Sequence, residues 1–145
     1  YIGMGWHERL DIVDLTNYIT NNYKGSQIVL FGVSMGAATV MSASGENLPR
    51  NVKAIIEDCG YTSTWNQFAY QLKALFKIPS FPLMHTASII CKFQAGYFIS
   101  EASPIKQIKK SNNTNTFLFM VIKTDLYLSL CLINFIMLHQ LKKKN

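Results

Sequence analysis

A serine between two glycines follows an apolar stretch of the chain. Residues 28–36 read Ile-Val-Leu-Phe-Gly-Val-Ser-Met-Gly, and small residues come next. The apolar run predicts a strand buried on both faces of a parallel sheet, and the small residues predict the start of a helix. A strand, a sharp turn that carries a serine, and a helix form a nucleophile elbow, from which a serine hydroxyl can attack a carbonyl carbon.

The residue types of this elbow suit that chemistry. Gly32 and Gly36 lack a Cβ, so we expect the strand and the helix to approach closely around Ser34. We expect strained backbone at Ser34, because strain of this kind often accompanies function. The helix start behind Ser34 offers free N–H groups to an oxyanion.

The rest of the pattern predicts alternating strands and helices, and therefore an α/β fold. Acids stand at the carboxyl end of the strand that follows the elbow, where sites of open parallel sheets lie. We expect strands over residues 28–31, 52–58 and 117–122, and helices over residues 8–22, 36–44, 62–77 and 83–93, with a short basic helix opened by Ser103-Pro104.

Several further stretches have a family likeness. They are Gly5-Trp6-His7-Glu8-Arg9-Leu10-Asp11-Ile12-Val13-Asp14, Ala54-Ile55-Ile56-Glu57-Asp58-Cys59-Gly60-Tyr61-Thr62-Ser63, Glu101-Ala102-Ser103-Pro104 and Lys109-Lys110-Ser111. With the elbow, they make residues 1–112 resemble the central part of an α/β-hydrolase. The branch it resembles is that of bacterial cell-surface hydrolases, related to prolyl-oligopeptidase-like peptidases and esterases.

This resemblance implies a partial α/β-hydrolase fold, with a parallel sheet, flanking helices and a helical cap segment over residues 62–99. The cap helices would either select the substrate or serve only as packing helices. The implied activity is that of a serine hydrolase, which transfers an acyl group from an ester, thioester or peptide substrate through Ser34. The Met35 N–H would donate to the oxyanion, and Gly32, Val33 and Gly36 would complete the elbow. We expect no cofactor and no metal site.

A serine nucleophile needs a histidine base and a carboxylate, which follow it in this superfamily in the order acid, then histidine. Ser34, Asp125 and His139 have that order. The residues between Asp125 and His139 are too few for the expected helix and strand, however. Asp58 is an alternative acid, since it ends the strand after the elbow. The other interpretation is that Asp58 only caps backbone N–H groups of the turn that follows. We expect structural roles for the remaining histidines, His7 and His85.

Residues 113–145 depart from the family pattern. Residues 119–128 read Phe-Met-Val-Ile-Lys-Thr-Asp-Leu-Tyr-Leu. At this place the family has the block His-Gly-Asp-x-Asp-x-x-Val-Pro, which includes the triad acid. The degenerate codons of these residues permit the family block in another frame. We therefore interpret the tail as an aberrant segment read out of frame, and we expect the chain to be inactive as it stands. The alternative is a non-catalytic fragment, or a membrane-associated protein that uses its apolar tail.

The formal net charge of +6 comes mainly from residues 101–145. No aromatic residues interleave with these lysines, so we do not expect nucleic-acid binding. The cysteines, Cys59, Cys91 and Cys131, form no Cys-x-x-Cys pair, and we expect reduced, buried thiols. The expected partner is a small-molecule or peptide acyl substrate.

Membrane contact is expected only through residues 126–141, where an apolar run precedes three lysines but is short for a membrane span. We interpret Tyr1 as lying inside the family pattern, with an N-terminal part before it. The sequence therefore leaves export undecided, and it is consistent with a cytoplasmic or a membrane-associated protein.

Overall fold

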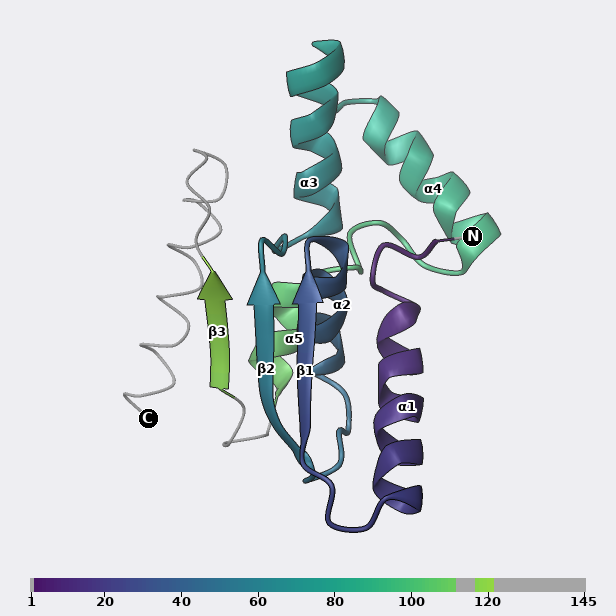
Figure 1. Cartoon of the computed structure of the whole chain (residues 1–145). Coiled ribbons are helices and arrows are strands. Elements are labelled where there is room, and N and C mark those ends of the chain that lie inside the picture. Colours follow the sequence, from purple (N-terminus) through teal and green to yellow (C-terminus); the bar gives the residue numbers. More distant parts are fainter. Residues whose placement is uncertain (1, 112–116, 122–145) are drawn as a thin grey trace.

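The computed structural model describes residues 2–111 and 117–121. Helices and strands alternate through most of this part, and their order agrees with the expected one (Figure 1). The elements are α1 (Glu8–Asn22), β1 (Ile28–Val33), α2 (Met35–Ala43), β2 (Val52–Asp58), α3 (Thr64–Gln71), the π-helix η1 (Leu72–Phe76), α4 (Leu83–Ala95), α5 (Pro104–Lys110) and β3 (Phe117–Val121).

The strands form a parallel sheet in the order β1-β2-β3. Gly32 of β1 lies opposite Glu57 of β2, and Val33 lies opposite Asp58. The strands point the same way, so their carboxyl ends share one edge of the sheet (Figure 1). The predicted α/β class, a parallel sheet flanked by helices, is confirmed.

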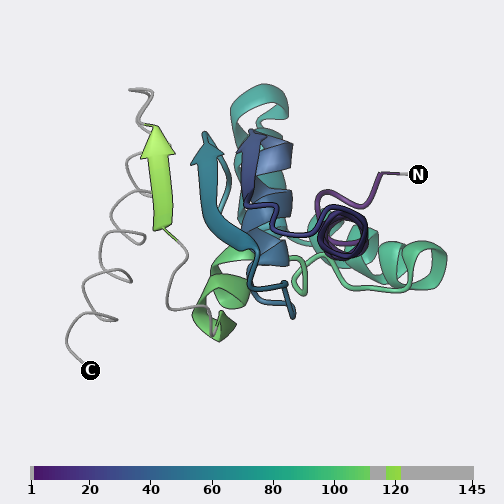
Figure 2. The ribbon, with the colours of Figure 1, turned by 60° about the horizontal axis from the view of Figure 1, so that its bottom comes forward.

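The helices α1, α2 and α5 gather on one face of the sheet, as Figure 2 shows. A core forms there between the sheet and the helices, from Ile28, Leu30, Val40, Leu48, Val52 and Ile55, with Ile12, Val13 and Ile19 packed against it. Helix α2 is the most buried helix, because its small side chains let it lie directly on β1 and β2.

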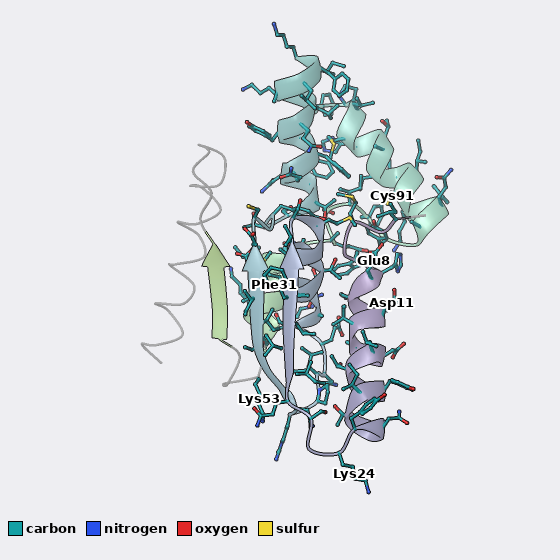
Figure 3. The ribbon with its side chains drawn as sticks, in the orientation of Figure 1. Glu8, Asp11, Lys24, Phe31, Lys53 and Cys91 are labelled. Atoms are coloured by element: carbon teal, nitrogen blue, oxygen red, sulfur yellow. The ribbon has the colours of Figure 1, made fainter. Side chains whose placement is uncertain are left out.

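The opposite face of the sheet corrects one expectation. The side chains of Val29, Phe31 and Val33 are more than half exposed, so β1 alternates between buried and exposed residues. Burial on both faces needs a layer on each side. Among residues 2–111 and 117–121, helices cover one side only (Figures 2 and 3). The prediction of a doubly buried strand is therefore wrong for this part of the chain.

Local signals set the helix ends. Glu8 and Asp11 lie in the first turn of α1, where acidic side chains interact favourably with the helix dipole. Gly25 follows α1 with φ +83°, and Gly96 ends α4 with φ +79°. Such left-handed positions favour glycine. Pro104 occupies the first turn of α5, where its missing N–H has no consequence.

Two antiparallel helical segments extend beyond the carboxyl edge of the sheet (Figure 1). The first runs through α3 and η1, and the second is α4; we call residues 64–95 the helical hairpin. The helices predicted over residues 62–77 and 83–93 are confirmed, although the first one ends in a π-helical turn. A capping role over an active site stays a prediction.

Candidate active site

Ser34 lies alone between β1 and α2, at the carboxyl edge of the sheet. Its backbone has φ 54° and ψ −112°, a combination that non-glycine residues rarely adopt and that costs about 1–3 kcal/mol. Its N–H donates to the Asp58 carbonyl at 2.8 Å, which fixes the turn against β2. The predicted strained turn between a parallel strand and a helix is confirmed.

Gly32 is required by the close contact of β1 with α2. A Cβ at this position would lie 2.3 Å from the Gly36 carbonyl oxygen and 2.7 Å from the Ala37 nitrogen. These are backbone atoms, so they cannot move aside as a flexible side chain can. At Gly36, by contrast, an added Cβ would meet no described atom within 4 Å. The expected close approach of the strand and the helix around Ser34 is therefore confirmed, and it requires a missing Cβ at Gly32 but not at Gly36.

The Ser34 side chain is exposed and does not cap α2. Its hydroxyl makes no hydrogen bond to any residue in the described part of the chain. The first N–H groups of α2, beginning with Met35, have no carbonyl acceptor within the helix. An exposed hydroxyl beside unpaired N–H groups is an arrangement that can accommodate a negatively charged oxygen.

The described histidines contact other residues. His7 Nε2 lies 2.8 Å from the Ala95 carbonyl oxygen, and its ring stands edge-on to Tyr97. The His85 ring packs edge-on against Trp65 and Phe81 in the hairpin. Neither histidine is hydrogen-bonded to Ser34. The predicted residues Asp125 and His139 lie outside the described residues.

Asp58 ends β2 beside the elbow. Its backbone carbonyl accepts the Ser34 N–H, and its carboxylate accepts a hydrogen bond from the Cys59 thiol at 3.2 Å. Its side chain is half-buried. Asp58 is thus a neighbour of Ser34 through the backbone, and its role as the acid stays a prediction.

Glu57 was missed by the sequence analysis. Its side chain is 1% exposed, and its carboxylate accepts the Gly60 N–H at 2.9 Å. Burial raises the pKa of Glu57, and the nearby Asp58 raises it further, while the hydrogen bond from Gly60 opposes both. The strand alternation offered a signal, since Ile55 and Glu57 are two residues apart and face the same core.

The loop before α1 is held by two tyrosines that follow β2 and α4, and it also contacts α2. The Tyr61 hydroxyl donates to the Met4 carbonyl at 2.8 Å, and the Tyr97 hydroxyl donates to the Gly3 carbonyl at 2.9 Å. Gly5 has φ +77°, which favours glycine, and an added Cβ would lie 3.0 Å from the Thr39 Oγ1, a tight contact. Burial raises the pKa of Tyr61 to about 12 and also raises the pKa of Tyr97.

A separate hollow lies at the helical hairpin. Its volume is about 450 Å³, and its walls come from Trp65, His85, Ser88, Ile89, Phe98 and Ser100. Most of this lining is apolar. No elbow residue belongs to it, so this hollow and the Ser34 turn are distinct features.

The sequence is similar to that of a protein from Bacillus subtilis. YqkD, an uncharacterized protein of Bacillus subtilis (strain 168), is 32% identical over 108 residues, which are 73% of this chain and 35% of the relative. The chain therefore spans about a third of the length of the curated relative it matches, to which it is distantly homologous. No protein-family model matches the chain, and no solved structure matches it.

Proposed function

We propose that this chain carries the nucleophile of an α/β-hydrolase-type serine hydrolase. The observation that supports this most is the backbone of Ser34, which has φ 54° at the turn from a parallel strand to a helix. A non-glycine residue keeps such a conformation only where its surroundings enforce it, and enforced strain concentrates at functional sites. The spacing of Gly32, Ser34 and Gly36 supports the same assignment.

The proposed reaction is acyl transfer. The Ser34 Oγ attacks the carbonyl carbon of an ester, thioester or peptide, and the carbonyl oxygen becomes an oxyanion. The Met35 N–H, at the amino end of α2, donates a hydrogen bond to that oxygen. The serine proton passes to a base, and the leaving group departs with a proton as the acyl-enzyme forms. Water then releases the acid in the second half of the reaction.

The 145-residue chain itself is proposed to turn over substrate slowly or not at all. Its described histidines, His7 and His85, contact residues of the hairpin region rather than Ser34. An unactivated serine loses several orders of magnitude in rate compared with a complete triad. We place the missing base and acid in the family block that residues 113–145 do not encode.

A fluorophosphonate probe tests this assignment, because it labels only activated serines. We would compare the 145-residue chain with a chimera in which its aligned stretch replaces the counterpart in YqkD. The chimera should be labelled at Ser34 and should hydrolyse a short-chain ester. Ser34→Ala should abolish both, whereas Ser100→Ala, a change at another exposed serine, should preserve both.

Labelling of the folded chimera at a different serine would refute Ser34 as the nucleophile. Failure of both the chimera and intact YqkD to react would favour a non-catalytic role. Hydrolysis by the 145-residue chain, lost in Ser34→Ala, would refute the proposed inactivity and would make Asp58 a working candidate for the acid.

A further inference from the structure

The helical hairpin exposes an unusual amount of apolar surface. Residues 73–79 and 81–83 are all exposed, and η1 contains no buried residue. Large apolar side chains stand in this region, with exposed fractions of 72% for Leu75, 65% for Phe76 and 71% for Phe81. In α4, Phe93 is 86% exposed. Large apolar side chains exposed in such number on one segment indicate an interaction site.

Packing within the molecule does not account for this surface. The only buried residues of α3 and α4, two helices that the structure describes in full, are Thr64, Met84 and Ser88, and none of the large exposed side chains is among them. The hairpin projects past the carboxyl edge of the sheet, away from the core beneath α1 and α2 (Figure 1). Its apolar side chains therefore face outward.

The charge of the hairpin identifies the chemistry of its partner. No aspartate or glutamate occurs between Asp58 and Glu101, whereas this stretch contains Lys73, Lys77 and Lys92. Lys92 lies 3.9 Å from Glu101, but Lys73 and Lys77 form no ion pair within the described residues. Cations next to exposed aromatic and aliphatic side chains suit an anionic, apolar surface.

We propose that the helical hairpin docks on the surface of an anionic lipid bilayer. Leu75, Phe76 and Phe81 enter the boundary between headgroups and acyl chains, and Lys73 and Lys77 pair with lipid phosphates and carboxylates. The hairpin lies at the interface and does not cross the bilayer. Within residues 2–111 and 117–121, no helix has the length and apolarity needed to span a membrane.

The same charges disfavour a second copy of this chain as the partner. In a symmetric dimer, the same surface faces itself, so Lys73 and Lys77 would face a partner surface that carries lysines and no acidic residue. Like charges without intervening acids oppose that contact. A bilayer that contains phosphatidylserine supplies both the negative charge and the apolar layer.

Vesicle co-sedimentation of the 145-residue chain tests this proposal. Vesicles of phosphatidylcholine with phosphatidylserine should sediment the protein, and vesicles of phosphatidylcholine alone should sediment much less of it. Lys77→Glu should weaken binding by about fivefold or more, since each cation near an anionic surface contributes about 1 kcal/mol. Phe76→Ser should weaken binding to the anionic vesicles as well.

Matched control variants lie at the opposite end of the molecule. Lys24 follows α1, below the start of the strands, as Figure 3 shows. Lys24→Glu makes the same change of charge as Lys77→Glu. Tyr23→Ser removes an aromatic ring that is 62% exposed, which matches Phe76→Ser. Both controls should bind like the unchanged chain, and far-ultraviolet circular dichroism should show that every variant is folded.

Three results would overturn the proposal. The first is an absence of vesicle binding by the folded chain. The second is equal vesicle binding by the hairpin variants and their controls. Residues 126–141 are the same in all variants, so this result would assign the contact to them or to another surface. The third is self-association that Lys77→Glu or Phe76→Ser abolishes, which would make the hairpin an interface between copies of the chain.

Discussion

Ser34 and Cys59 both have positive φ, and they stand at equivalent places in neighbouring strands. Each directly follows the last residue of its strand, and those last residues, Val33 and Asp58, are partners across β1 and β2. The angles are 54° for Ser34 and 58° for Cys59. Adjacent strands therefore end in strained turns at the same point of the sheet. The Ser34 N–H bonds to the Asp58 carbonyl, and the Gly60 N–H bonds to Glu57, so hydrogen bonds hold both turns.

The backbone at Cys59 predicts the effect of a side-chain change. Cys59→Val should lower the free energy of unfolding by about 1–2 kcal/mol, because a β-branched residue is poorly tolerated at positive φ. Cys59→Asn should cost less, since asparagine adopts this region more readily. Urea denaturation measures both, with Cys91→Val in α4 as the helical control. Equal losses for Val and Asn at position 59 would instead assign the effect to the lost thiol.

The two elbow glycines should respond oppositely to alanine. Gly32→Ala places a Cβ 2.3 Å from the Gly36 carbonyl oxygen, and should lower the free energy of unfolding by about 2–3 kcal/mol. Gly36→Ala meets no described atom within 4 Å and lies in the first turn of α2, so it should raise stability by about 0.5–1 kcal/mol. Thermal and urea unfolding would measure the two changes. A larger loss at Gly36 than at Gly32 would contradict the described packing.

Glu57 should make stability depend on pH. Its pKa is raised in the folded state, so its contribution is fully present below the ordinary value of 4.5 and is lost as pH rises through the raised value. Glu57→Gln removes this titration and keeps an oxygen that can accept the Gly60 N–H. The variant should be more stable than the unchanged chain at neutral pH, and the difference should shrink in acid. A difference that did not change with pH would contradict a raised pKa.

Tyr61 should make the free energy of unfolding depend on pH in the alkaline range. Its folded-state pKa is about 12 against an ordinary 10.0, so its contribution is present below pH 10.0 and is lost as pH rises toward 12. Tyr61→Phe should flatten that alkaline decline. It should also cost about 1 kcal/mol near neutral pH, because the Met4 carbonyl loses its donor. Chemical unfolding at neutral pH and at alkaline pH measures the free energy of unfolding of the variant. Tyr23→Phe, a change at an exposed tyrosine, is the control.

The sequence predicted the elements around the elbow well, for physical reasons. The helix over residues 8–22 and the strand over residues 52–58 have the predicted bounds, since acids, apolar spacing and Gly25 marked them locally. The turn at Ser34 was predictable because the Gly-x-Ser-x-Gly spacing follows an apolar run and precedes small residues, a pattern typical of a strand, a sharp turn and a helix. Local residue types decide local backbone geometry, and these predictions needed nothing more.

The errors concern features that depend on distant residues. Exposure of Val29 and Phe31 depends on which layers cover the sheet, which an apolar strand cannot specify. Which of the two consecutive acids, Glu57 or Asp58, is buried depends on which face of β2 the helices cover. The roles of Asp125 and His139 stay predictions, outside the described residues.

The sparse attachment of the helical hairpin has a consequence for how the protein moves. Three residues of α3 and α4 are buried, whereas β2 is hydrogen-bonded to a strand on each side. A segment with little buried surface opens without the rest of the molecule unfolding. Backbone amides of the hairpin should then exchange their hydrogens with solvent early. Amides of β2 and α2 should exchange only when the whole sheet opens, so exchange should follow two separate timescales.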